Sequence, residues 1–111
     1  MQNRNQSIKS DAGKLMLELI PPETYISLGR VLTYGAEKYS PNSWQDVEEE
    51  RYVGALLRHL TAYMQDPTGC DEESGLLHIE HVLCNAMFLN WIVKQVEDDG
   101  YIPDDLFVKG E

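Results

Sequence analysis

The chain has 111 residues, which suffices for one hydrophobic core and is short for two typical domains. Hydrophobic residues make up 42% of it, which excludes intrinsic disorder as the expected state of the whole chain. The formal net charge of −10 makes duplex nucleic acid and anionic membranes poor partners and makes divalent cations better ones. No apolar run reaches the length of a membrane span, so we expect a protein without a membrane partner.

The charge is distributed unevenly along the chain. Residues 1–44 contain five basic and four acidic side chains, whereas residues 45–111 contain four basic and fifteen acidic ones. An anionic small molecule would meet the least repulsion in the first part, and a cation would be attracted to the carboxylates of the second. The two halves together favour a ligand that combines a metal ion with phosphate.

The first segments predict a tail and an arm. Residues 1–8 are polar and aperiodic, which indicates a flexible tail before a single all-α domain at 9–111. Lys9 and Lys14 flank a turn-forming stretch in which Gly13 permits close approach to the backbone, so both lysines are candidate phosphate contacts. The short apolar stretch that follows stops at a Pro-Pro pair, which predicts an anchored arm.

Three helices are expected from apolar residues at three- and four-residue spacing, at about 22–39, 48–65 and 76–96. The inward stripe of the first consists of Tyr25, Leu28, Leu32, Ala36 and Tyr39. No alternating apolar run predicts a strand, so the fold class is all-α: a compact bundle of about three helices with an N-terminal arm, completed by oligomerisation. The third helix is apolar nearly all round, which places Phe88, Trp91 and Ile92 at or near a subunit contact in a dimer or tetramer.

The three histidines of the chain lie on two of these helices. His78 and His81 share one face of the third helix with Asn85, and His59 lies on the second. If the helices pack antiparallel around one crevice, these imidazoles and Glu37 point into it, as in helical bundles that bind divalent metals. The alternative is that the histidines are hydrogen-bonded core residues. Glu80 lies on the opposite side of its helix, so we expect it to be solvated or to contact a partner.

Other residue types narrow the chemistry. Arg58 is a further candidate for phosphate binding, although the chain has no P-loop motif. Tyr34 and Trp44 offer flat surfaces for stacking a base, with core packing as the alternative. Cys84 lies in an apolar stretch, which predicts a buried and unreactive thiol, and neither it nor Cys70 belongs to a CxxC pair.

Several strings of the sequence resemble a known family. These are Lys-Ser-Asp-Ala-Gly-Lys at 9–14, Tyr-Gly-Ala-Glu-Lys-Tyr at 34–39, Arg-His-Leu at 58–60, and the block Glu-Ser-Gly-Leu-Leu-His-Ile-Glu-His at 73–81. Together they resemble the phage-encoded dATP/dGTP diphosphohydrolases, MazZ-like relatives of the all-α MazG nucleotide pyrophosphohydrolases. The resemblance implies hydrolysis of a deoxynucleoside triphosphate to monophosphate and pyrophosphate, in the cytoplasm of a host cell if the chain is phage-encoded.

The resemblance also implies roles for particular residues. The implied metal ligands are Glu37, His59, Glu73, His78 and His81. Glu37 or Glu73 would orient or deprotonate the attacking water, with Lys14 and Arg58 stabilising charge on the pyrophosphate. The nucleotide-binding residues are expected to be Lys9, Asp11, Lys14, Tyr34, Lys38, Trp44, Arg58 and Asn85.

One departure from the better-known MazG pattern concerns the metal. That pattern uses acidic pairs, whereas this chain places His59, His78 and His81 at such positions. The cofactor is expected to be Mg²⁺, Mn²⁺ or Co²⁺, and imidazole suits Mn²⁺, Co²⁺ or Zn²⁺ better than Mg²⁺. Two alternatives remain open at this point: a protein that binds or sequesters a nucleotide without turnover, and a helical interaction module with packed histidines.

Overall fold

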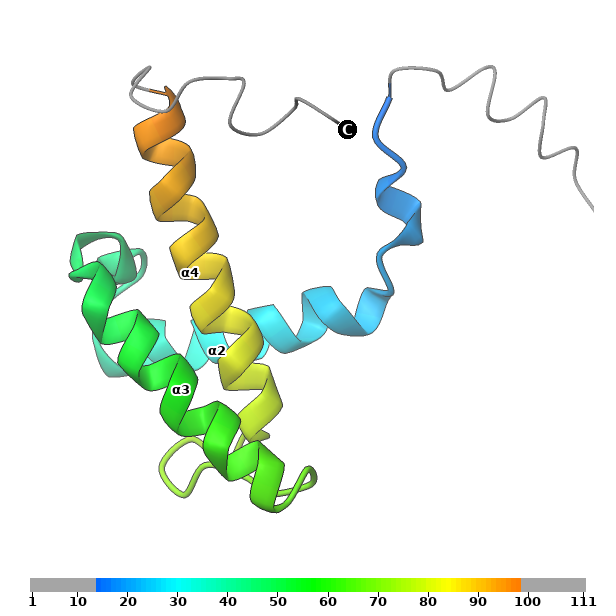
Figure 1. Ribbon diagram of the computed structural model, residues 1–111, viewed down its shortest axis with the longest axis vertical. Helices are drawn as coiled ribbons and strands as arrows, with labels where there is room; N and C mark the ends of the chain where they lie inside the picture. Colours follow the sequence, from blue (N-terminus) through cyan, green and yellow to red (C-terminus); the bar gives the residue numbers. More distant parts are fainter. Residues whose placement is uncertain (1–13, 99–111) are drawn as a thin grey trace, which may run out of the picture.

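The computed structural model of the chain describes residues 14–98 and confirms the all-α prediction (Figure 1). Its three main helices are α2 (Pro22–Lys38), α3 (Glu49–Gln65) and α4 (His78–Asp98), preceded or joined by the short 3-10 helices η1 (Leu17–Leu19) and η2 (Ser43–Asp46). Each main helix begins and ends within two residues of its predicted bounds. The expected tail at 1–8, together with Lys9 and Asp11, lies outside the described residues.

Prolines and charged first turns explain where the helices begin and end. Pro22 occupies the first turn of α2, where the fixed φ of proline suits a helix and its missing N–H costs nothing. The chain leaves α2 at Tyr39 and turns through Asn42, whose φ of 65° lies in the left-handed region that asparagine tolerates. α3 carries Glu49 and Glu50 in its first turn, where negative charge stabilises the helix dipole.

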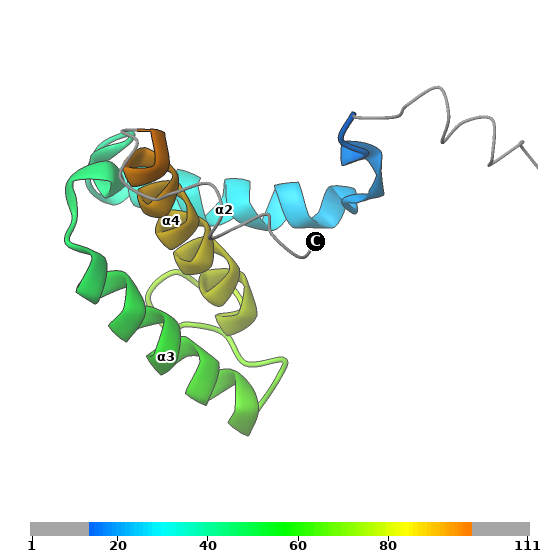
Figure 2. The ribbon, with the colours of Figure 1, turned by 45° about the horizontal axis from the view of Figure 1, so that its top comes forward.

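Helix α4 is the central element of the fold. It packs along α3 and also contacts α2 and η2. Figures 1 and 2 show α2 crossing α4, and the arm that precedes α2 extending away from the three helices. The expectation of three antiparallel helices around one crevice is therefore wrong for α2, which lies across the bundle and presents one of its faces to the N-terminal half of α4.

The core lies where α4 meets the other elements. Its buried side chains are Val31, Tyr52, Cys84 and Phe88. The ring of Trp44 stacks on Phe88 with centroids 4.8 Å apart, and the phenol of Tyr52 donates a hydrogen bond to the Trp44 carbonyl. Phe88 is only 9% exposed within one chain, so it needs no partner subunit to cover it.

The crossing of α2 changes which of its residues face inward. Val31 is buried, and Leu28 and Leu32 pack against the core as expected. Tyr25 and Tyr39, at the two ends of the predicted stripe, are 52% and 70% exposed, so their assignment to the core was wrong. A helix that crosses its neighbour buries only the turns near the crossing point, whereas the periodic stripe assumed contact along its whole length.

Most of the exposed large apolar side chains lie outside α4, on which Ile79 and Val93 are the exposed ones among the described residues. The arm and the start of α2 expose Leu15, Leu17, Leu19, Tyr25 and Ile26, and the outer face of α3 exposes Leu57 and Met64. Within residues 14–98, no helix combines the length and the apolar character needed to cross a bilayer.

Candidate metal and nucleotide site

The three histidines meet at the end of the bundle where α4 begins. The Nδ1 atoms of His59 on α3 and His78 on α4 are 2.9 Å apart. The ring of His81 stacks on that of His59, with centroids 4.4 Å apart and an interplanar angle of 10°. The predicted convergence of the histidines on α3 and α4 is therefore present in the structure.

Asp71 joins this cluster, and we did not predict it as a site residue from the sequence. One ligand atom each from His59, Asp71 and His78 lies within 4.8 Å of the other two. The loop holds Asp71 in place, because its Oδ2 accepts hydrogen bonds from the backbone N–H groups of Glu73 (3.0 Å) and Ser74 (2.9 Å). An Asp followed by backbone donors two and three residues later is an Asx-type turn, and that local pattern was the available signal.

The electrostatics of the cluster suit a cation. Burial alone would raise the pKa of Asp71, but the Ser74 N–H bond and the nearby His81 and His59 hold it below its usual value. The pKa of His59 is lowered by burial and by the adjacent His81, and the pKa of His81 is lowered by burial. These shifts favour an ionised Asp71 carboxylate and neutral imidazoles at His59 and His81, and these are the forms in which such groups bind metals.

The residues present fit a divalent metal. The 2.9 Å between the two Nδ1 atoms is close to the roughly 3 Å expected between adjacent ligands of an octahedral ion bound at about 2.1 Å. Two imidazoles and one carboxylate form a mixed donor set that suits Mn²⁺, Co²⁺ or Zn²⁺. His81 is not part of this three-residue group, and its Nε2 lies 2.7 Å from the hydroxyl of Ser74.

Glu73, a predicted metal ligand and catalytic group, is paired with Lys38 of α2. The ammonium of Lys38 contacts the Glu73 carboxylate, and this contact lowers the pKa of Glu73 and raises that of Lys38. The same ammonium lies 5.8 Å from the ring centroid of Tyr34. Three predicted residues, Tyr34, Lys38 and Glu73, are thus brought together beside the histidines, although Glu73 lies outside the three-residue metal group.

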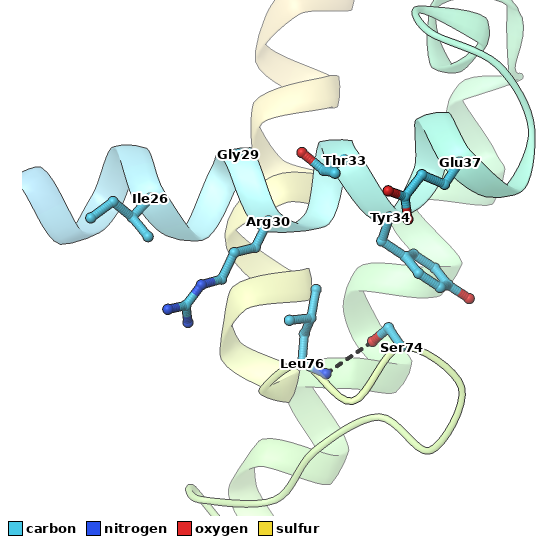
Figure 3. A pocket seen from close by; sticks show the side chains of 8 residues that line it. All are labelled: Ile26, Gly29, Arg30, Thr33, Tyr34, Glu37, Ser74 and Leu76. Carbon is cyan, nitrogen blue, oxygen red and sulfur yellow. Dashed lines mark hydrogen bonds between the residues drawn. The ribbon is translucent and has the colours of Figure 1, made fainter.

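An open groove of about 580 Å³ adjoins the cluster along α2 (Figure 3). Its lining includes Arg30, Thr33 and Glu37 from one face of the helix, with Ser74 and Leu76 from the loop opposite. Two lining residues, Tyr34 and Ser74, contact His81 and so connect the groove to the histidines. The Tyr34 ring packs edge-on against that of His81, with ring centroids 6.5 Å apart, and the Ser74 hydroxyl contacts the His81 Nε2. Glu37 therefore lies in the groove and not among the three clustered metal donors.

Glu80 differs from its sequence prediction. It is 5% exposed, not solvated, and its Oε2 accepts a hydrogen bond of 2.7 Å from the hydroxyl of Ser27 on α2. Its Oε1 accepts a hydrogen bond from the backbone N–H of Leu77, at the start of α4. The crossing of α2 explains the difference, because it brings a helix against the side of α4 that we expected to face solvent.

The remaining predicted nucleotide-binding residues lie elsewhere. Trp44 is packed between Phe88 and Trp91, two to three turns along α4 from His81. Lys14 precedes η1 on the arm, and this arm extends away from the three main helices (Figure 1). The guanidinium of Arg58 is directed back along α3 toward Gly54. Asn85 is buried, and its amide donates to the His81 carbonyl.

The fold and the site together define a class of protein: an all-α domain that places clustered histidine and aspartate donors beside a groove. Residues 4–100 match the family described as "dATP/dGTP diphosphohydrolase, N-terminal". The chain is also 36% identical over 86 residues to a protein of Salmonella phage PMBT28 named dATP/dGTP diphosphohydrolase. No solved structure matches the chain.

The chain belongs to the dATP/dGTP diphosphohydrolase N-terminal family, which confirms the resemblance found in the sequence motifs. The match to the phage protein covers 78% of this chain and 29% of that relative. The chain therefore spans less than a third of the length of the curated relative that it matches.

Proposed function

We propose that this chain hydrolyses a deoxypurine nucleoside triphosphate to the monophosphate and pyrophosphate, with a divalent metal, in the nucleotide metabolism of a phage. Family membership supports the reaction class, and the name of the phage relative supports dATP or dGTP as substrate. The observation that carries the proposal is the cluster of His59, Asp71 and His78 beside the α2 groove.

The three clustered donors are the residues that would hold the metal. When bound, a divalent metal supplies charge neutralisation for the triphosphate and lowers the pKa of a coordinated water. Phosphoryl chemistry of this kind depends mainly on positioning and electrostatic stabilisation. The ring of His81 contacts the Ser74 hydroxyl through Nε2 and stacks on the ring of His59. His81 would therefore orient the metal ligand His59 without binding the metal itself.

Of the two predicted catalytic carboxylates, Glu37 is better placed to accept a proton from the attacking water. It has no hydrogen-bond or ion-pair partner among residues 14–98, and it lines the groove. Glu73 is engaged by Lys38. A general base needs an available lone pair within reach of the water, which favours Glu37 in the proton-accepting role. The Lys38–Glu73 pair instead joins α2 to the loop before α4.

Pyrophosphate release from dATP and dGTP with Mn²⁺, Co²⁺ or Mg²⁺ tests the proposal. His78→Ala should abolish metal-dependent release, whereas Asn90→Ala, an exposed polar position three turns further along α4, should leave it unchanged. Binding of the nucleotide by the unaltered chain without any release would instead establish the non-catalytic alternative. Release that persists in His78→Ala would contradict the assigned metal site.

We also propose that the chain acts in the cytoplasm as a homo-oligomer, a dimer or tetramer. The support is the set of apolar side chains on the arm and on the outer face of α3, which are exposed among residues 14–98 of one chain. Sedimentation across micromolar to millimolar concentration tests it, and a strictly monomeric species would contradict it.

A further inference from the structure

The groove along α2 poses a charge problem for an anionic ligand. The protein carries a net charge of −10, and the groove itself is lined by the carboxylate of Glu37. Among the described lining residues, Arg30 is the only basic one. A triphosphate that enters this groove therefore meets one cationic side chain before any metal is considered.

Arg30 is held at the groove by a buried carboxylate. Its Nη1 lies 3.6 Å from Oε2 of Glu80, and the Arg30 side chain is 60% exposed while that of Glu80 is 6% exposed. Glu80 is fixed in turn from two sides, by the Ser27 hydroxyl of α2 and by the Leu77 N–H at the start of α4. A guanidinium has five N–H donors, so one edge can face Glu80 while the other faces the groove.

The described cations that the sequence predicts for nucleotide binding are less well placed. Lys38 is committed to Glu73, and Arg58 points back along α3. Lys14 is carried by the arm that extends away from the bundle in both ribbon views. Arg30 combines exposure, a position in the groove and a fixed anchor, and its groove meets the histidine cluster through Ser74.

We propose that Arg30 binds the phosphates of the nucleotide in the α2 groove, and that Glu80 is a positioning residue that orients its guanidinium. The inference deepens the proposed function and depends on it for the identity of the substrate. Guanidinium pairs with phosphate oxygens through two parallel hydrogen bonds, which a lysine cannot reproduce.

Calorimetric titration with the non-hydrolysable α,β-methylene analogue of dGTP, in the presence of Mn²⁺, measures the contribution of Arg30. Arg30→Ala should weaken binding about 10- to 100-fold, the range expected for charge-assisted hydrogen bonds. The affinity of Arg30→Lys should lie between that of the unaltered chain and that of Arg30→Ala, because lysine keeps the charge and loses the two parallel hydrogen bonds. Arg51→Ala, which removes the same charge from an exposed position in the first turn of α3, should bind as the unaltered chain does.

The role of Glu80 is tested by coupling. Glu80→Gln keeps the shape of the side chain and an oxygen for the Leu77 N–H, and it should weaken analogue binding less than Arg30→Ala does. The double variant should bind no more weakly than Arg30→Ala alone, because Glu80 acts through Arg30. Additive losses in the double variant, or a lowered Tm with unchanged analogue affinity, would show that Glu80 only stabilises the fold.

Inorganic tripolyphosphate, titrated in parallel, separates this inference from the proposed function. If the chain binds tripolyphosphate in an Arg30-dependent manner but releases no pyrophosphate from dGTP or dATP, the function fails and the phosphate-binding role of Arg30 stands. If the chain hydrolyses dGTP while Arg30→Ala binds the analogue and tripolyphosphate with unchanged affinity, the function stands and Arg30 is excluded. Failure of the unaltered chain to bind either probe overturns both.

Discussion

The two ends of α4 differ in the side chains that they carry and in the partners that these contact. At its N-terminal end, His78, Glu80 and His81 meet polar partners from α2, α3 and the loop that precedes the helix. Further along, Phe88 and Trp91 meet the aromatic side chains of η2 and α3. One helix thus carries a polar cluster suited to ligand binding and an aromatic cluster suited to packing, which separates stability from function along a single element.

The largest expected effect is a loss of stability on substitution at the aromatic end of α4. Phe88→Ala should lower the free energy of unfolding by about 3–5 kcal/mol, because it removes a ring packed between Trp44 and Tyr52 and leaves a cavity. Chemical denaturation measures this loss. In the folded fraction, Mn²⁺ affinity should stay the same, and a parallel loss of metal binding would show that the two ends are not independent.

The converse change at the polar end should alter binding more than stability. Asp71→Asn keeps the side-chain shape and removes the charge that faces the two imidazoles, so Mn²⁺ affinity should fall by about 10- to 100-fold. Titration calorimetry measures the affinity. Asp46→Asn, at the aromatic end of the molecule, serves as the matched control and should leave Mn²⁺ affinity unchanged. Unchanged affinity in Asp71→Asn would remove Asp71 from the site.

The polar end should also make stability depend on pH. The pKa values of His59 and His81 are lowered from 6.5 in the folded chain, mainly by burial, so below pH 6.5 the unfolded chain binds more protons than the folded one. Stability is therefore fully present above pH 6.5 and declines as the pH falls below it. Metal-free denaturation curves at pH 7.5 and 5.5 should show this decline, and it should shrink in His81→Gln.

The smallest expected effect concerns the two thiols. Cys84 lies on α4 between the two ends, is 0% exposed, and has a pKa raised by burial to about 12. Cys70 is exposed in the loop before α4. A thiol reagent should therefore modify Cys70 in the native protein and Cys84 only on unfolding. Rapid modification of Cys84 under native conditions would contradict a packed centre of α4.

The sequence predicts the elements of this fold better than their arrangement. Prolines at positions 21, 22, 41 and 67 mark both ends of α2 and the end of α3, and the spacing of apolar residues predicts all three helices to within two residues. The crossing of α2 over α4 depends on side-chain packing between segments about fifty residues apart, and no local pattern encodes it. Both Glu80 and Tyr25 were assigned to the wrong environment for this reason.

The site shows the same division. Histidine spacing on α3 and α4 predicts a cluster, and the structure contains it. We did not predict Asp71 as a site residue because its position depends on the turn of a loop. We did not predict Arg30 because its ion-pair partner, Glu80, lies on another helix. The turn-forming string Asp-Glu-Glu-Ser-Gly at 71–75 was the signal in the sequence that could have identified Asp71.

The most direct test of the metal site is the anomalous signal of a crystal of this chain soaked with Mn²⁺. The account predicts a peak among Nδ1 of His59, a carboxylate oxygen of Asp71 and a ring nitrogen of His78, at about 2.0–2.2 Å from each. A peak held instead by Glu37 and Glu73, with the histidine cluster empty, would contradict it.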